Sequence, residues 1–141
     1  MAHELTASVS LVAGDRFDAA TGSGGRAPLA PAAEREPTGA ISPMEALLVA
    51  LGGCLGMSVA PILRKMRQRV TRYEIRVSGA LTERPPRVFE AITVEHLIAG
   101  TDLDAAAIER ALALAETRYC GASAMLGKAA HITHRLTLVE D

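Results

Sequence analysis

One long apolar segment constrains the fold of this chain more than any other feature. Ser42, Pro43 and Glu45 have the spacing of a capping box, with serine as the cap, proline at the first helical position and glutamate three residues after the serine. The apolar run that follows predicts a helix from Ser42 to about Arg67, kinked or broken near Pro61. Glycines, a serine and that proline interrupt the run, which makes it a poor membrane span.

Much of the remaining sequence has the alternation of strands. Apolar and polar residues alternate in a half-buried strand at 5–11 and in later strands at 73–78, 92–98 and 132–138. Two short strands are expected around 16–18 and 27–29, on either side of the glycine-rich turn at 22–25. Pro85 and Pro86 indicate a hairpin connection between the second and third of the longer strands.

Two further helices are expected in the C-terminal half. Thr101 is predicted to cap a helix in which Ile108, Leu112 and Ala115 share one face, and a short helix is expected at 120–128. Because strands and helices are segregated along the chain, the predicted fold class is α+β. No repeat or linker is visible, so the 141 residues are expected to form a single domain, 1–141.

The composition limits the classes of partner that the protein is expected to bind. Aromatic residues make up 3% of the chain, so small aliphatic side chains must fill the core, which favours an oligomer. The net charge of -1 argues against nucleic acid and anionic membranes as partners, and the basic residues near Arg67 are interpreted as a solvated helix end. No signal peptide is visible at the amino terminus, so a cytoplasmic location is expected.

The sequence contains two cysteines, Cys54 and Cys120. Cys54 lies in the glycine-rich part of the predicted long helix, and Cys120 lies at a break between two apolar runs. A thiolate can attack a peroxide and become a sulfenic acid, which a second thiol converts to a disulfide. The alternative is that both cysteines simply pack in the core, as free cysteines often do.

Two motifs around these cysteines resemble the OsmC/Ohr superfamily of peroxide-reducing proteins, and are most similar to its YhfA-type subgroup. The first is Gly52-Gly53-Cys54 after the helix start at 42–48, and the second is the segment 116–126 around Cys120. The hairpin at 81–92 and the residues at 100–104 also match. The resemblance covers residues 42–139, with motifs and hairpin in the same order and spacing.

The resemblance implies an OsmC-like fold, with antiparallel sheets around a long central cysteine-bearing helix and an intertwined homodimer. It implies that Cys54 is the peroxidatic nucleophile and Cys120 the resolving thiol. The implied substrates are organic hydroperoxides, which are reduced to alcohols while a lipoyl-type dithiol or small thiol restores the cysteines. No metal, haem or flavin cofactor is implied.

The residues that would activate the thiol are less clear from the sequence. Family members carry a glutamate directly after the proline that opens the helix, where this chain has Met44. Glu45 is the next residue, but it lies nine residues before Cys54, about 13 Å along the helix axis and on about the opposite face. It would reach Cys54 only through a bend or from a partner subunit, and its capping role is a sufficient explanation.

Arg35 stands at roughly the spacing where the family carries its arginine, and Arg16 and Arg26 are alternatives. The departure at Met44 keeps a second function open, a catalytically weak protein that senses thiol chemistry or binds a small apolar ligand. His131 and His134 are separated by an odd number of positions, so they should point to opposite faces of a strand and cannot form a metal pair by themselves.

Overall fold

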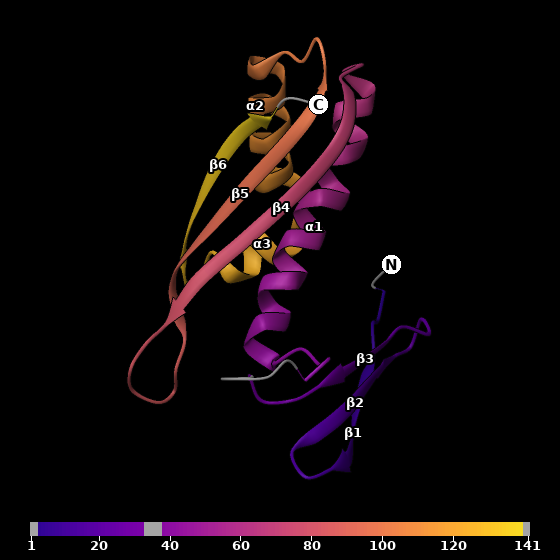
Figure 1. Cartoon of the computed structure of the whole chain (residues 1–141), viewed down its shortest axis with the longest axis vertical. Coiled ribbons are helices and arrows are strands. Elements are labelled where there is room, and N and C mark those ends of the chain that lie inside the picture. Colours follow the sequence, from indigo (N-terminus) through magenta and orange to yellow (C-terminus); the bar gives the residue numbers. More distant parts are fainter. Residues whose placement is uncertain (1–2, 33–37, 140–141) are drawn as a thin grey trace. The chain divides into compact units, whose positions relative to one another are not determined.

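The computed structural model of the protein describes residues 3–32 and 38–139 (Figure 1). The described chain divides into two compact units, Met1–Leu47 and Leu48–Asp141. The boundary falls inside the long helix α1 (Pro43–Lys65). Strands and helices are segregated along the chain, so the predicted α+β class is confirmed. The single domain proposed for residues 1–141 stays a prediction.

The first unit contains an antiparallel sheet in the order β1 (Ala7–Ala13), β2 (Arg16–Thr21) and β3 (Arg26–Leu29). The two short strands and the glycine turn between them are therefore confirmed. The prediction of a half-buried first strand is wrong, because all seven residues of β1 are exposed. Alternation gives β1 an apolar face, but the described part of the chain does not cover that face.

The start of α1 has the predicted capping box. The Glu45 carboxylate accepts a hydrogen bond from the Ser42 N–H at 3.0 Å, and the Ser42 hydroxyl accepts one from the Glu45 N–H at 3.3 Å. The helix continues through Pro61 without a break and ends at Lys65. Arg67 follows in the left-handed region, with φ 58°, which directs the chain out of the helix.

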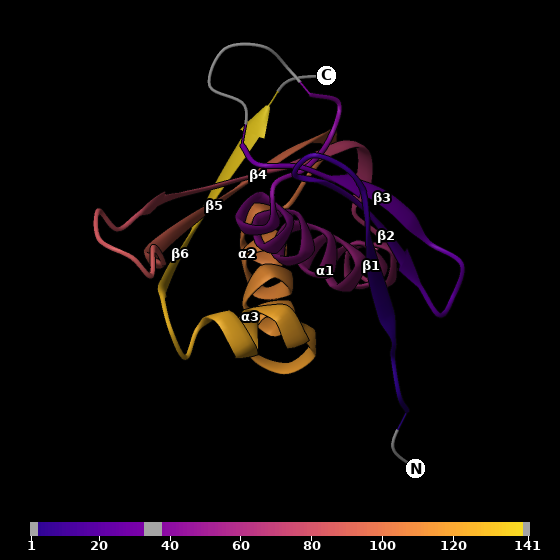
Figure 2. The same cartoon turned by 90° about the horizontal axis from the view of Figure 1, so that it is seen from below.

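The second unit contains a mixed sheet in the order β4 (Arg69–Leu81), β5 (Phe89–Thr101) and β6 (His131–Val139). β4 and β5 form the predicted antiparallel hairpin. β5 and β6 are parallel, which corrects the expectation of antiparallel sheets. A parallel pair needs a crossover connection, and helix α2 (Ala105–Leu114) with the segments that follow it supplies one. Figure 2 shows the helices of this unit gathered on one face of the sheet.

The cap of α2 also differs from the prediction. Thr101 is the last residue of β5, and the Asp104 carboxylate caps the helix by accepting a hydrogen bond from the Ala107 N–H at 3.2 Å. The expected face of Ile108, Leu112 and Ala115 is confirmed, because all three belong to the buried core.

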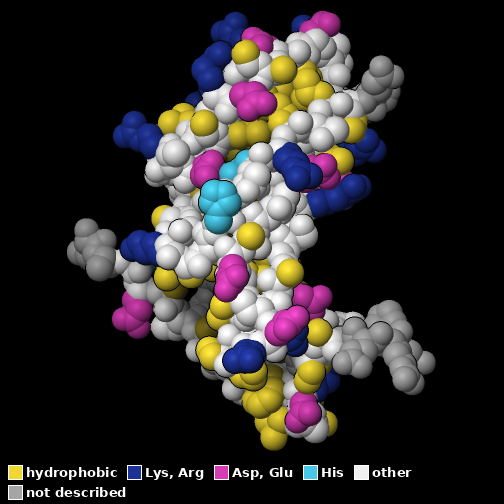
Figure 3. Space-filling view, turned by 90° about the vertical axis from the view of Figure 1, so that its left-hand side faces the viewer, with side chains coloured by type: hydrophobic (Ala, Val, Ile, Leu, Met, Phe, Trp, Pro, Cys, Tyr) yellow, Lys and Arg dark blue, Asp and Glu magenta, His cyan; other side chains and the backbone are white. Residues whose placement is uncertain are grey.

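The core of the second unit lies between the sheet, α1 and α2. α1 is long and apolar enough to cross a membrane by length and composition alone. However, a stripe of its residues at intervals of four is buried, which is the pattern of a core helix: Leu51, Leu55, Val59 and Leu63. Figure 3 shows histidine at the surface of one face, among charged and hydrophobic side chains that are scattered over that face.

Glycine allows α1 to lie close to β4. A Cβ atom at Gly56 would lie 3.0 Å from Ile75 Cδ1, and one at Gly52 would lie 3.2 Å from Val77 Cγ2. At Gly53, by contrast, a Cβ would have no neighbour within 4 Å among the described residues. Two of the three glycines around Cys54 thus serve helix–sheet packing, and Gly53 leaves open space.

Candidate functional site

The two cysteines lie at the meeting point of α1 and a short turn that the sequence did not predict. Ala115–Tyr119 forms one turn of π-helix, called η1, directly after α2. The Cys120 N–H closes this wide turn by donating to the Ala115 carbonyl at 2.8 Å. Single π turns inside helical segments are frequent at functional sites, but nothing in the local residue types indicates one here.

Cys120 also begins the next helix, α3 (Gly121–Leu126). Its sulfur accepts a hydrogen bond from the Ser123 N–H at 3.3 Å, which makes Cys120 the N-cap. The short helix predicted at 120–128 is therefore confirmed with slightly narrower bounds. The N–H groups of Gly121 and Ala122 hydrogen-bond to the sulfur of Cys54. This turn of backbone is thus arranged around two sulfur atoms.

The two thiols are hydrogen-bonded to each other and have different acidities. Burial acts to raise the pKa of the Cys54 thiol, but hydrogen bonds from Cys120 and from the Ala122 and Gly121 N–H groups outweigh it and hold the pKa below its usual value. Burial, followed by the hydrogen bond with Cys54, raises the pKa of Cys120 to about 11. Cys54 is therefore the better nucleophile of the pair, and Cys120 remains protonated and donates to it.

Access to the two thiols also differs. Cys54 is partly exposed, whereas Cys120 is buried with 3% of its surface accessible. A mainly apolar pocket of about 470 Å³ lies beside this turn and is lined in part by Met57, Ser58 and Tyr119, with Lys65 at its edge. Ser58 is one helical turn from Cys54 and donates to its carbonyl at 2.9 Å, so the pocket borders the thiol-bearing turn of α1.

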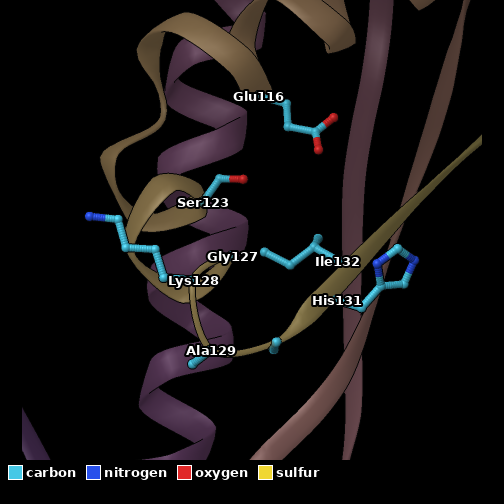
Figure 4. Close-up of a pocket in the computed structure, with 8 residues that line it drawn as sticks. Glu116, Ser123, Gly127, Lys128, Ala129, His131 and Ile132 are labelled. Carbon is cyan, nitrogen blue, oxygen red and sulfur yellow. The ribbon is translucent and has the colours of Figure 1, made fainter.

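A second pocket, of about 460 Å³, is lined by residues of η1, of α3 and of the segment that leads into β6 (Figure 4). The Glu116 carboxylate and the Ser123 hydroxyl point into the same space, above the side chain of Ile132. Lys128 lines the pocket but points away from that space. Glu116 was not predicted as a site residue, because one glutamate on a helical segment carries no distinguishing signal in the sequence.

The other predicted site residues belong to the segment before Cys54, and those that the structure describes have partners or exposure of their own. The Glu45 carboxylate is bound in the capping box, and its hydrogen bonds with the Ser42 side chain and backbone lower its pKa. Arg35 lies outside the described residues. Arg16 donates to the Thr38 carbonyl at 3.1 Å, and Arg26 is exposed. The groups that shift the Cys54 pKa include none of the charged side chains in the described part of the chain.

The histidine prediction is confirmed in its geometry. His131 is exposed on one face of β6, and His134 is directed to the other face, with 15% of its side chain accessible. Within residues 3–32 and 38–139 there is no group of three or more histidine, cysteine or acidic side chains that could hold a metal ion. His134 instead contacts a buried histidine, His96, which was not predicted from the sequence to lie at a site.

Comparisons with known proteins agree with the fold. The family model described as OsmC-like protein matches residues 36–135. Protein YhfA of Escherichia coli K12 is 41% identical over 98 residues, which cover 70% of this chain and 73% of that protein. The crystal structure of a hypothetical protein from Aquifex aeolicus has a TM-score of 0.87 at 25% identity, covering 99% of both chains.

An organic hydroperoxide resistance protein, OsmC, from Legionella pneumophila has a TM-score of 0.72 at 16% identity, covering 96% of this chain and 97% of that one. At this identity the likeness concerns the fold alone. Together the matches confirm the OsmC-like fold and the similarity to the YhfA type that the two cysteine motifs indicated.

Proposed function

The chain belongs to the OsmC-like protein family, and on that premise we propose that it reduces organic hydroperoxides with its two thiols. The observation that carries the proposal is the environment of Cys54. The residue is partly exposed, its sulfur receives hydrogen bonds from Cys120 and two backbone N–H groups, and its thiol pKa is below the usual value. A thiolate in such a setting is the species that attacks peroxides.

In the proposed reaction the Cys54 thiolate attacks the terminal peroxide oxygen and the O–O bond breaks. The alkoxide that leaves takes up a proton and departs as an alcohol, and Cys54 becomes a sulfenic acid. The sulfur of Cys120 then attacks the Cys54 sulfur, a disulfide forms, and water is released. An external dithiol, of lipoyl or small-molecule type, restores both thiols and is itself oxidised to a disulfide.

The hydrogen bond between the thiols supports this division of roles. Before attack, Cys120 donates its proton toward Cys54 and stabilises the thiolate. After attack, the same proximity places Cys120 beside the sulfenic acid. Apolar residues near Cys54, such as Met57 and Tyr119, suit the organic part of a hydroperoxide. We propose a cytoplasmic homodimer that works without a metal, haem or flavin.

A peroxide-consumption assay with cumene hydroperoxide and dithiothreitol tests the proposal. Cys54→Ser is expected to abolish consumption, because serine cannot form the sulfenic acid. Cys120→Ser should still form a sulfenic acid at Cys54, which dimedone labelling and mass spectrometry detect, but should not form the intramolecular disulfide. Unchanged consumption in Cys54→Ser would overturn the mechanism.

A second candidate function is binding of a small apolar ligand with little turnover, or thiol sensing. The pocket of about 470 Å³ beside Met57 and Tyr119 favours it, together with the engagement of Glu45 in the capping box. The same sulfenate labelling separates the two functions. Slow labelling of Cys54 under excess hydroperoxide, with saturable binding of an apolar fluorescent probe, would favour the binding protein.

A further inference from the structure

Four polar side chains in the second unit form a continuous chain that the proposed chemistry does not use. The Tyr73 hydroxyl lies 2.6 Å from His96 Nδ1, and His96 Nε2 lies 3.3 Å from His134 Nδ1. His134 Nε2 lies 3.3 Å from Glu116 Oε1. The members come from β4, β5, β6 and η1, so the chain crosses the whole sheet and ends on the turn that precedes Cys120. We call it the imidazole chain.

The imidazole chain lies partly within the apolar core. His96 has no accessible surface, and its ring stacks on that of His134 with centroids 5.6 Å apart and planes 17° apart. Tyr73 packs against the core cluster formed by α1, α2 and β5. Buried polar groups destabilise a fold unless they find partners, so placing two imidazoles here requires that each nitrogen be directed at a specific neighbour.

The last contact of the imidazole chain, between His134 and Glu116, is electrostatic. His134 Nε2 is buried and, among the described residues, has no acceptor aligned for a hydrogen bond, although Glu116 Oε1 is within ion-pair distance. A carboxylate at 3.3 Å favours a hydrogen on this nitrogen, whether the ring is neutral or protonated. If Nε2 lacked the hydrogen, its lone pair would face a negative charge.

The preference for a hydrogen on His134 Nε2 sets the direction of the hydrogen bonds in the imidazole chain when both rings are neutral. With the hydrogen on His134 Nε2, His134 Nδ1 must accept, so His96 Nε2–H donates to it and His96 Nδ1 accepts from the Tyr73 hydroxyl. Burial, and the repulsion that a proton on His134 would add, lower the pKa of His96 to about 4, so His96 is neutral near pH 7. Every donor in the chain therefore points toward Glu116.

Other titratable groups near the chain are few. Lys128 and His131 line the pocket into which Glu116 points, and both are exposed. The charged residues of α1 and α2 in this unit, such as Arg64 and Glu109, are exposed, and these helices present apolar side chains to the core. Within the described residues, His134 is thus the basic group that contacts the Glu116 carboxylate, through a buried Nε2.

Glu116 is well placed to influence the thiols, because it is the second residue of η1. The hydrogen bond that closes this turn runs from the Cys120 N–H to the Ala115 carbonyl, directly before Glu116. The next two residues after Cys120 supply the N–H groups that bind the Cys54 sulfur. A shift of η1 would therefore move Cys120 and both N–H groups together.

We propose that the imidazole chain is a positioning element for the thiol pair. Through the contact of His134 with Glu116 it holds η1 against the sheet, and so keeps Cys120 and the N–H groups of Gly121 and Ala122 on the Cys54 sulfur. Glu116 and His134 are positioning residues that do not touch the substrate. The inference deepens the proposed function, but its first consequence is the acidity of Cys54, which is measurable without turnover.

The test is the rate of Cys54 alkylation by iodoacetamide between pH 5 and 10, read by mass spectrometry of the reduced protein. Glu116→Gln and His134→Gln are expected to slow alkylation at pH 7 about three- to tenfold and to move the inflection to higher pH, because one pKa unit changes the thiolate fraction about tenfold. Glu109→Gln, an exposed change on α2, is the matched control and should leave the profile unchanged. Glu116→Asp, which keeps the charge, should restore part of the rate.

Two further measurements separate positioning from general damage. Circular dichroism and melting curves identify variants that fail to fold. If Glu116→Gln or His134→Gln does not fold, Tyr73→Phe, which removes one hydroxyl, takes its place in the alkylation test. It is likewise expected to slow alkylation of Cys54 at pH 7. Nitrogen-15 spectra of the imidazoles should show His96 neutral and protonated at Nε2 at pH 7.

An alkylation profile in folded Glu116→Gln that coincides with that of the wild type would overturn the proposal. If the wild type consumes no hydroperoxide but the alkylation profiles shift as described, the proposed function fails and the positioning role stands.

Discussion

At the residue scale, the proposed chemistry depends on a difference in acidity between the two thiols. The pKa of Cys54 is held below its usual value, and that of Cys120 is raised to about 11, although both are cysteines in one small cluster. The difference arises because Cys54 receives hydrogen bonds from three donors, whereas Cys120 is buried and acts as one of them. The spacing of the cysteines in the sequence does not contain this information.

Replacing Cys120, which donates a hydrogen bond to the Cys54 sulfur, tests why the two thiols differ in acidity. In Cys120→Ala, Cys54 loses the side-chain hydrogen bond that stabilises its thiolate, so its pKa should rise. We expect alkylation of Cys54 at pH 7 to slow by roughly threefold to tenfold. A pH–rate profile measures this change, and an unchanged profile would mean that the backbone N–H groups alone set the acidity. Ser58→Ala, near Cys54 but without a part in its thiol hydrogen bonds, is the control.

His96 should make the protein sensitive to acid. Its pKa is lowered to about 4 in the folded state, chiefly by burial, from an ordinary value of 6.5. Above pH 6.5 both folded and unfolded chains hold it neutral; below that pH the unfolded chain takes up a proton that the folded chain does not. Stability should therefore fall by roughly 3 kcal/mol as the pH decreases from about 6.5 to about 4.

Urea denaturation at pH 7 and pH 5 measures this loss. His96→Gln should lose less stability between the two pH values than the wild type, since a non-titrating group replaces the imidazole. His131→Gln, exposed on the opposite side of β6, should behave like the wild type. Equal pH dependence in His96→Gln and the wild type would assign the acid sensitivity to other groups.

At the scale of elements, the start of α1 was easier to predict from the sequence than its end. The capping box defined the start of the helix, because serine, proline and glutamate act through local hydrogen bonds. Its end at Lys65 and its passage through Pro61 were predicted less well, since these depend on packing against the sheet. Likewise Asp104 rather than Thr101 caps α2, because β5 extends to Thr101 through pairing with β4.

The glycines of α1 give a test of helix–sheet packing. Gly56→Val would place its Cβ against Ile75, whereas the Cβ of Gly53→Val would have no neighbour within 4 Å in the described chain outside the adjoining helix backbone. Both changes alter helix propensity equally, so the difference between them isolates packing. We expect Gly56→Val to unfold with a free energy roughly 1–3 kcal/mol lower than Gly53→Val. Thermal or urea denaturation measures it, and equal stabilities would contradict the close approach of α1 to β4.

At the scale of the whole molecule, several apolar surfaces of the single chain face solvent. All of β1 is exposed, and on α1 the side chain of Met57 is 81% exposed on the helix that also carries the buried stripe. Exposed apolar surface of this kind marks an interaction site in a soluble protein. It supports the proposed homodimer, in which such surfaces would be covered.

The dimer makes a direct prediction for Met57→Glu. A carboxylate buried in an apolar interface would weaken association by roughly tenfold or more. Sedimentation equilibrium over a range of concentrations measures the dissociation constant, and Arg64→Glu, an exposed change on the same helix, is the control. A wild-type chain that stays monomeric at high micromolar concentration would refute the homodimer.

The sequence by itself determined the α+β class, the capped cysteine helix, the hairpin and the family, because these follow from local spacing, alternation and two specific motifs. Only the tertiary structure decided the parallel pairing of β5 with β6, the π turn before Cys120 and the burial of His96 beside His134. It also decided which thiol is the more acidic. These features arise from contacts between residues distant in the chain, whose burial and hydrogen bonds no local pattern encodes.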